Sequence, residues 1–177
     1  LGSGFGSILF TDCRTAEDAT ECVRITRPDT PEDGGLYSVY TRRNTYMGYG
    51  GGTDYVEAMR NTVVNLMIEK KEAVENLEEI LSVKGVDMIQ WGPSDYSMSV
   101  GKAGQRNDPA IADAKKEVFK TALSMGVHPR AEIGTPDDAK EYLDMGVKHF
   151  NMGVDISVLH GWWKSNGEEL RKAVEAS

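Results

Sequence analysis

Two carboxylates follow consecutive apolar segments and could together hold a metal ion. Glu69 comes directly after the apolar run 62–68, and Asp95 ends the Gly-Pro-Ser-Asp segment that follows the run 86–91. Because neighbouring parallel strands end at the same edge of a sheet, the two side chains are expected to converge there. Two carboxylates with open coordination positions suit a hard divalent cation such as Mg²⁺ or Mn²⁺, and the N–H groups of Ser94 and Asp95 could face an anion. The alternative is a pair of solvated carboxylates at the strand ends.

Arginines elsewhere in the chain could contact a negatively charged substrate. Arg42 and Arg43 lie in a long loop, where either guanidinium could bind a carboxylate, although paired loop arginines are more often solvated. Arg130 and Glu132 alternate along the predicted strand 127–133 and therefore share one face of it. Either could support the site at the sheet edge, with a structural ion pair as the alternative.

Short apolar runs alternate with amphipathic helical patterns along the chain. Thr15, with Asp18 three residues later, has the form of a capping box, and Asp108-Pro109 is a typical helix start. The predicted strands are 7–10, 62–68, 86–91, 127–133 and 147–152, and the predicted helices include 55–60, 71–81 and segments starting at 108 and 135. This repeated order predicts parallel strands joined by helical crossovers.

The predicted fold class is α/β, a (β/α)₈ TIM barrel of which this chain holds about the last five strand–helix units. A complete barrel takes about 250 residues, whereas this chain has 177. An open Rossmann sheet is disfavoured because no Gly-x-Gly-x-x-Gly turn follows the first predicted strand. We expect a single domain, 1–177, with a long irregular loop at 27–53 and C-terminal helices at 156–177.

Composition and charge disfavour several classes of partner and location. The chain carries 20 Lys and Arg against 28 Asp and Glu, a formal net charge of −8, without the basic patch of a nucleic-acid-binding protein. No apolar run approaches the length of about 18 residues that a membrane helix needs. Cys13 and Cys22 are too few for a disulfide framework, so we expect a reducing, cytoplasmic location.

Four short segments share the pattern of one known family. They are Ile-Glu at 68–69, Asn-Leu-Glu-Glu-Ile at 76–80, Gly-Val-Asp at 85–87 and Gly-Pro-Ser-Asp-Tyr-Ser-Met-Ser-Val-Gly at 92–101. On these motifs the chain resembles the HpcH/HpaI aldolase (citrate lyase-like) family of the pyruvate/phosphoenolpyruvate-binding superfamily. Lys70 stands where the family usually has Thr.

The resemblance implies a (β/α)₈ barrel and a divalent-metal (class II) aldolase in which Glu69 and Asp95 bind Mg²⁺ or Mn²⁺. It also implies that the metal chelates the keto and carboxylate oxygens of pyruvate, while the Ser94 and Asp95 amides hold the carboxylate. No Schiff-base lysine is then required. The family's catalytic His and substrate-binding Arg lie on strands without a counterpart in this chain, so the catalytic residues stay unassigned.

The resemblance further implies a homo-oligomer, commonly a hexamer with exchanged C-terminal helices. Trp162 and Trp163 could form such a contact, together with Leu159.

The expected reaction is reversible cleavage of a 4-hydroxy-2-oxo acid to pyruvate and an aldehyde. A Lewis acid on the keto oxygen would stabilise the enolate that forms when the C3–C4 bond breaks. One alternative is other chemistry on the same enolate, such as oxaloacetate decarboxylation or acyl-CoA ester lyase chemistry. Another is a non-catalytic partial-barrel subunit that needs a partner for the first three strands.

Overall fold

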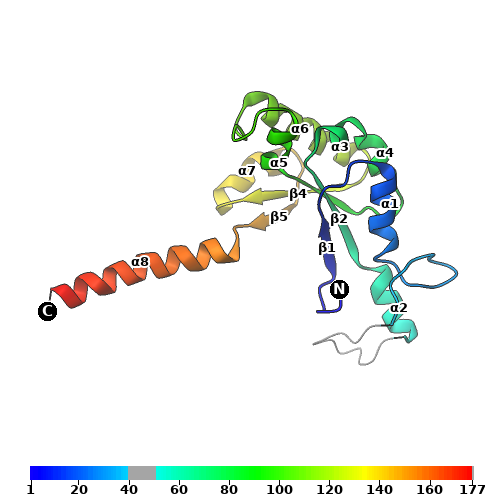
Figure 1. The fold of residues 1–177 in the computed structure, drawn as a ribbon, viewed down its shortest axis with the longest axis horizontal. Coiled ribbons are helices and arrows are strands. Elements are labelled where there is room, and N and C mark those ends of the chain that lie inside the picture. Colours follow the sequence, from blue (N-terminus) through cyan, green and yellow to red (C-terminus); the bar gives the residue numbers. More distant parts are fainter. Residues whose placement is uncertain (40–50, 177) are drawn as a thin grey trace.

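Five parallel strands form one curled sheet in the computed structural model, which describes residues 1–39 and 51–176 (Figure 1). Neighbours in the sheet are also neighbours along the chain, in the order β1-β2-β3-β4-β5. Each adjacent pair is parallel. The strands are β1 Ser7–Phe10, β2 Val63–Ile68, β3 Met88–Trp91, β4 His128–Ile133 and β5 His149–Met152. A sheet that curls while adding strands in chain order has the geometry of part of a barrel.

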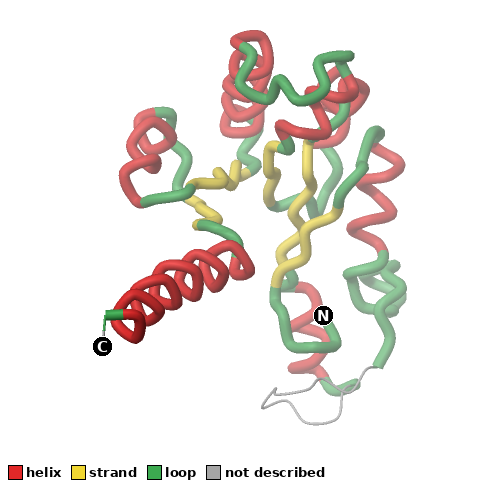
Figure 2. Tube along the Cα trace, turned by 60° about the vertical axis from the view of Figure 1, so that its left-hand side comes forward, coloured by secondary structure: helices red, strands yellow, loops and turns green. Residues whose placement is uncertain are grey.

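Helices follow the strands and cover one face of the sheet (Figure 2). The capping box predicted at Thr15 is confirmed, as is the start of the helix at Asp108, whose side chain accepts from the Ala110 N–H. The helices are α1 Ala16–Arg24, α2 Thr53–Arg60, α3 Lys71–Glu75, α4 Leu77–Leu81, α5 Pro93–Ser99, α6 Pro109–Ser124, the 3₁₀ turn η1 Pro136–Asp138, α7 Ala139–Asp144 and α8 Asp155–Glu175.

The core lies between the sheet and this helical layer. Alternate residues of β2, such as Val64 and Leu66, are fully buried and pack with helical side chains that include Ile80 and Phe119. The other face of the sheet carries polar side chains, among them Asn65, Gln90, Arg130 and His149. The apolar face of the sheet therefore packs against the helical layer, and the polar face lies opposite to it.

The helix predicted at 71–81 is interrupted. It ends as α3 at Glu75 and starts again as α4 at Leu77, because Asn76 leaves the helical conformation (φ −97°, ψ 16°). The Asn76 side-chain amide instead donates to the Arg14 carbonyl, 3.0 Å away, and so ties this helix pair to the loop after β1.

Two further segments are helical. The Gly-Pro-Ser-Asp segment belongs to the start of a helix, because Pro93 starts α5 with Gly92 as its N-cap. The C-terminal region, expected to be helical, forms one helix, Asp155–Glu175. The predicted loop 27–53 lies partly outside the described residues, and its described part contains a bridge between Pro28 and Tyr37 and, from Thr53, the start of α2.

The helix α8 extends away from the sheet (Figure 1) and buries none of its side chains. Its exposed apolar residues repeat at helical spacing and include Leu159, Trp162, Trp163 and Leu170. The two indole rings contact edge to face, with centroids 4.6 Å apart. Within residues 1–39 and 51–176, no helix combines the length and apolarity needed to cross a bilayer.

Candidate functional site

Glu69 lies directly after β2 and is buried, with 5% of its surface exposed. Its Oε1 accepts a hydrogen bond of 2.8 Å from the backbone N–H of Asp12, which follows β1. Asp12 adopts a left-handed backbone conformation (φ 61°), which Asp tolerates better than most residues. The end of β1 therefore fixes one oxygen of a carboxylate on β2.

Gly92 allows Glu69 to approach the end of β3 closely. A Cβ atom at position 92 would lie 2.6 Å from the Glu69 Cβ and 2.9 Å from its Oε2. The backbone of Gly92 itself is ordinary (φ −109°, ψ 84°), so the requirement for glycine is one of space. The strand end thus keeps room beside the second oxygen of Glu69.

Asp95 reaches the same edge from the first turn of α5. Its Oδ1 accepts a hydrogen bond of 2.9 Å from the Lys70 ammonium, which also lies 3.1 Å from Asp12 Oδ1. The Arg14 guanidinium is 3.3 Å from the same Asp12 oxygen. The ends of β1, β2 and β3 are therefore joined by one chain of contacts, from Glu69 through Asp12 and Lys70 to Asp95.

These contacts shift two pKa values in opposite directions. The hydrogen bond from Lys70 lowers the pKa of the Asp12 carboxyl, and the hydrogen bond to Asp95 raises the pKa of the Lys70 amine. Both groups are consequently charged at neutral pH. Asp12 is identifiable from the sequence as a polar residue at a strand end, but the bridging position of Lys70 is not.

A cavity of about 860 Å³ opens at these strand ends. Glu69, Ser94, Asp95 and Glu132 all line it, so the structure brings together the predicted metal and anion groups. Its remaining lining residues include Gly92, Arg106, Lys115, Tyr142 and Ser157, contributed by α6, α7 and α8 or by the loops after β3 and before α6.

Arg130, predicted from the sequence to support the site, is not among the residues that line this cavity. Arg130 is half-buried on the polar face of the sheet, where its Nε donates to Gln90 Oε1 at 2.7 Å. Burial lowers the pKa of its guanidinium. No ion pair between Arg130 and Glu132 is found in the described part of the chain. Arg42 and Arg43 lie outside the described residues.

The donors at this edge fit a divalent cation that takes only part of its coordination shell from protein. Mg²⁺ is commonly held by one or two carboxylates together with water and substrate oxygens. Glu69 and Asp95 supply two carboxylates, and the absent side chain of Gly92 leaves room beside the Glu69 Oε2. Over residues 1–39 and 51–176 no set of three His, Cys, Asp or Glu side chains is grouped as a metal site. Water or substrate oxygens would therefore have to complete the coordination of such an ion.

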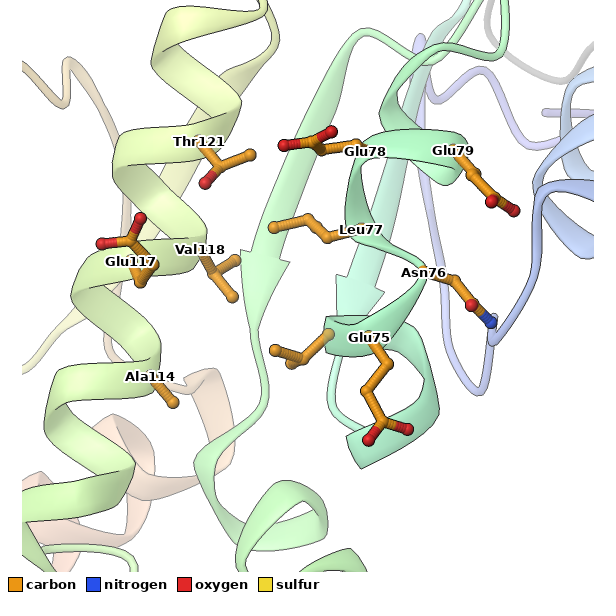
Figure 3. Close-up of a pocket in the computed structure, with 10 residues that line it drawn as sticks. Glu75, Asn76, Leu77, Glu78, Glu79, Ala114, Glu117, Val118 and Thr121 are labelled. Atoms are coloured by element: carbon orange, nitrogen blue, oxygen red, sulfur yellow. The ribbon is translucent and has the colours of Figure 1, made fainter.

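A second cavity, of about 570 Å³, lies between α4 and α6 (Figure 3). Leu77 and Val118 point toward each other across it, whereas Glu79 and Asn76 point away. This cavity belongs to the helical layer and contains none of the strand-end groups. The strand-end cavity is therefore the candidate site.

Comparison with known sequences places the chain in a family. The sequence model described as HpcH/HpaI aldolase/citrate lyase matches residues 1–160. An Escherichia coli protein named 4-hydroxy-2-oxo-heptane-1,7-dioate aldolase is 31% identical over 160 residues, which are 90% of this chain and 60% of that protein. The chain thus spans about 60% of the length of the curated relatives it matches.

Solved structures share the fold. An HpcH/HpaI aldolase/citrate lyase family protein from Burkholderia cenocepacia has a TM-score of 0.77 and 27% identity, and the match covers 96% of this chain and 66% of that one. A citrate lyase β subunit from M. tuberculosis, complexed with oxaloacetate and magnesium, has a TM-score of 0.54 and 11% identity, and the match covers 83% and 55%. The latter similarity shows the fold alone.

Proposed function

Because the chain belongs to the HpcH/HpaI aldolase/citrate lyase family, we propose that it carries the metal-binding part of a carbon–carbon lyase. The proposed reaction is the divalent-metal-dependent, reversible cleavage of a 4-hydroxy-2-oxo acid to pyruvate and an aldehyde. The name of the Escherichia coli relative supports this reaction class. The observation that supports it most strongly is that buried Glu69 and half-exposed Asp95 line one cavity at the strand ends.

The residues of this chain would bind and orient the substrate. Glu69 and Asp95 would hold Mg²⁺ or Mn²⁺, in keeping with the magnesium named for the citrate lyase structure. When bound, such an ion acts as a Lewis acid that favours negative charge on the keto oxygen of a 2-oxo acid. The N–H groups of Ser94 and Asp95 lie in the first turn of α5, where no intrahelical acceptor is available, and would hold the substrate carboxylate.

Arg130 is a weaker candidate for substrate binding. It would have to exchange its hydrogen bond with Gln90 for one to a carboxylate. Arg42 stays a candidate from the sequence.

We further propose that the five strand–helix units correspond to the last five of a (β/α)₈ barrel. The sheet has two unpaired edge strands, β1 and β5, in the described part of the chain. Asn65 is fully buried on the polar face, yet its side-chain amide has no hydrogen-bond partner among the described residues. Both features are those of a sheet that further strands would close. The general base for the 4-hydroxyl group would then come from those strands.

Exchange of the pyruvate methyl protons in D₂O tests the proposed enolate chemistry. We expect NMR to show exchange with Mg²⁺ or Mn²⁺ present and its loss after a chelator is added, because the metal stabilises the enolate. Exchange that a chelator does not affect would contradict the metal site. Absence of exchange with metal would contradict enolate formation by this chain and favour a non-catalytic subunit. Turnover of oxaloacetate or an acyl-CoA substrate, without aldol cleavage, would favour the alternative lyase reactions.

We also propose that α8 mediates self-association. Trp162 and Trp163 are 55% and 66% exposed, and an apolar helix face of this kind is typical of a protein–protein contact. A Trp162→Glu/Trp163→Glu double variant is expected to reduce the native mass to that of one chain, measured by light scattering. Lys164→Glu changes the net charge by the same amount on the polar side of α8 and should keep the mass of the unaltered protein. A native mass that is the same in all three proteins would contradict this role for α8.

A further inference from the structure

Lys70 occupies an unusual place for a lysine. Its side chain is only 15% exposed, and its ammonium lies between the carboxylates of Asp12 and Asp95. Those partners are separated from it by 58 and 25 positions along the chain. The adjacent Lys71 shows the common alternative, since its side chain is 58% exposed and pairs with Glu75 on the same helix.

The ammonium competes directly for a proposed metal ligand. It donates to Asp95 Oδ1, while the Asp12 N–H donates to Glu69 Oε1. In the described part of the chain, no hydrogen bond reaches Asp95 Oδ2 or Glu69 Oε2, so each carboxylate keeps one oxygen for another cation. A divalent ion on those oxygens would lie close to the Lys70 charge, and like charges at short range repel strongly in a partly buried site.

Neighbouring charges do not remove this repulsion. Asp12 is the second carboxylate that contacts Lys70, but its Oδ1 also lies 3.3 Å from the Arg14 guanidinium. Arg14 itself is shared with Glu72, 3.7 Å away, and is half-exposed. In the described part of the chain, Lys70 is the cation paired directly with Asp95.

We propose that Lys70 is an internal cation that holds Asp95 in the metal-free protein and weakens metal binding by competing for that carboxylate. This inference rests on the proposed metal site at Glu69 and Asp95. It makes Lys70 a positioning residue that acts on the metal through Asp95. A lysine that merely braces Asp95 for the metal would have the opposite effect, because its removal would weaken metal binding.

Titration with Mn²⁺, followed by the electron paramagnetic resonance of the free ion, separates these two roles. Lys70→Met removes the charge and is expected to bind Mn²⁺ about tenfold more tightly or better, within the range by which groups around a ligand alter metal affinity. Lys70→Arg keeps the charge and should stay within about threefold of the unaltered protein. Lys71→Met removes a neighbouring charge outside the site and is the matched control, with no change expected.

Thermal unfolding with and without Mn²⁺ gives a second readout. Lys70→Met should unfold at a lower temperature without metal, because Asp12 and Asp95 lose their common partner, and should gain more from added Mn²⁺. Lys70→Gln, which is neutral but can donate hydrogen bonds, provides a second uncharged variant if the Met variant does not fold.

Equal or weaker Mn²⁺ binding by the uncharged variants overturns the competition, while the proposed metal site stands. If neither the unaltered protein nor any variant binds Mn²⁺, both the competition and the metal site are wrong. Tighter binding by Lys70→Arg as well would show that charge is not the cause, and would also overturn the proposal.

Discussion

Replacing Glu69 with Gln is expected to reduce metal-dependent exchange of the pyruvate methyl protons by about 100-fold or more. Loss of a group that only supports a metal ligand already costs about 10–100-fold in affinity or activity, and Glu69 is proposed as a ligand itself. The amide oxygen of Gln can still accept the hydrogen bond that Asp12 now donates to Glu69 Oε1. The substitution therefore removes the negative charge while keeping the contact between the ends of β1 and β2.

Three measurements on this variant belong together: the exchange rate by NMR, the Mn²⁺ affinity and the unfolding temperature. Glu72→Gln is the matched control, since Glu72 lies three residues later with a half-exposed side chain near Arg14. We expect it to retain exchange and Mn²⁺ affinity. If Glu69→Gln retains both while its unfolding temperature is unchanged, Glu69 is not a metal ligand.

Much of the fold is predictable because its signals are local in the sequence. Each of the five predicted strands is confirmed in position, with ends that differ by two residues or fewer. Buried parallel strands have short, nearly continuous apolar runs, and the helices between them have an apolar stripe and a capped start. The capping box at Thr15 and the N-cap at Asp108 each depend on residues within four positions, so the sequence shows both.

The departures from prediction arise from contacts between distant segments. Asn76 interrupts a helix because its amide bonds to the Arg14 carbonyl, 62 positions earlier. The helix α5 begins at the proline of a Gly-Pro pair, which is also compatible with a turn, and Tyr96 of this helix packs on Trp91 of β3. The periodicity of the sequence indicates neither of these contacts.

The site likewise has a part that is predictable from the sequence and a part that is not. Glu69 and Asp95 are identifiable because parallel strands place their carboxyl ends at one edge. The bridge that Lys70 makes between Asp12 and Asp95 requires three strand ends to be positioned at once. Side-chain direction at that edge depends on backbone conformation, including the left-handed Asp12, which the sequence pattern does not specify.

The second large effect is expected for Gly92→Ala. The new methyl group would lie 2.6 Å from the Glu69 Cβ, so either the carboxylate or the end of β3 has to move. Overpacking of this kind costs about 1–3 kcal/mol, and each kcal/mol lowers the unfolding temperature of a chain of this size by about 2–4 °C. Because the new methyl group presses on the side chain of Glu69, we also expect Mn²⁺ affinity to fall by about tenfold or more, as for other changes that misplace a ligand.

Gly6→Ala is the control for Gly92→Ala, since nothing lies within 4 Å of a Cβ at position 6, just before β1. Alanine there should leave the unfolding temperature unchanged or raise it slightly, because it restricts the unfolded chain. Gly92 has φ −109°, which alanine adopts freely, so any loss at position 92 comes from crowding, mainly by Glu69 and to a smaller extent by Met67 Cγ at 3.2 Å. Unchanged stability and Mn²⁺ binding in Gly92→Ala would contradict the tight approach of Glu69 to β3. A stability loss with unchanged Mn²⁺ binding would instead show that the end of β3 moves and that Glu69 keeps its position.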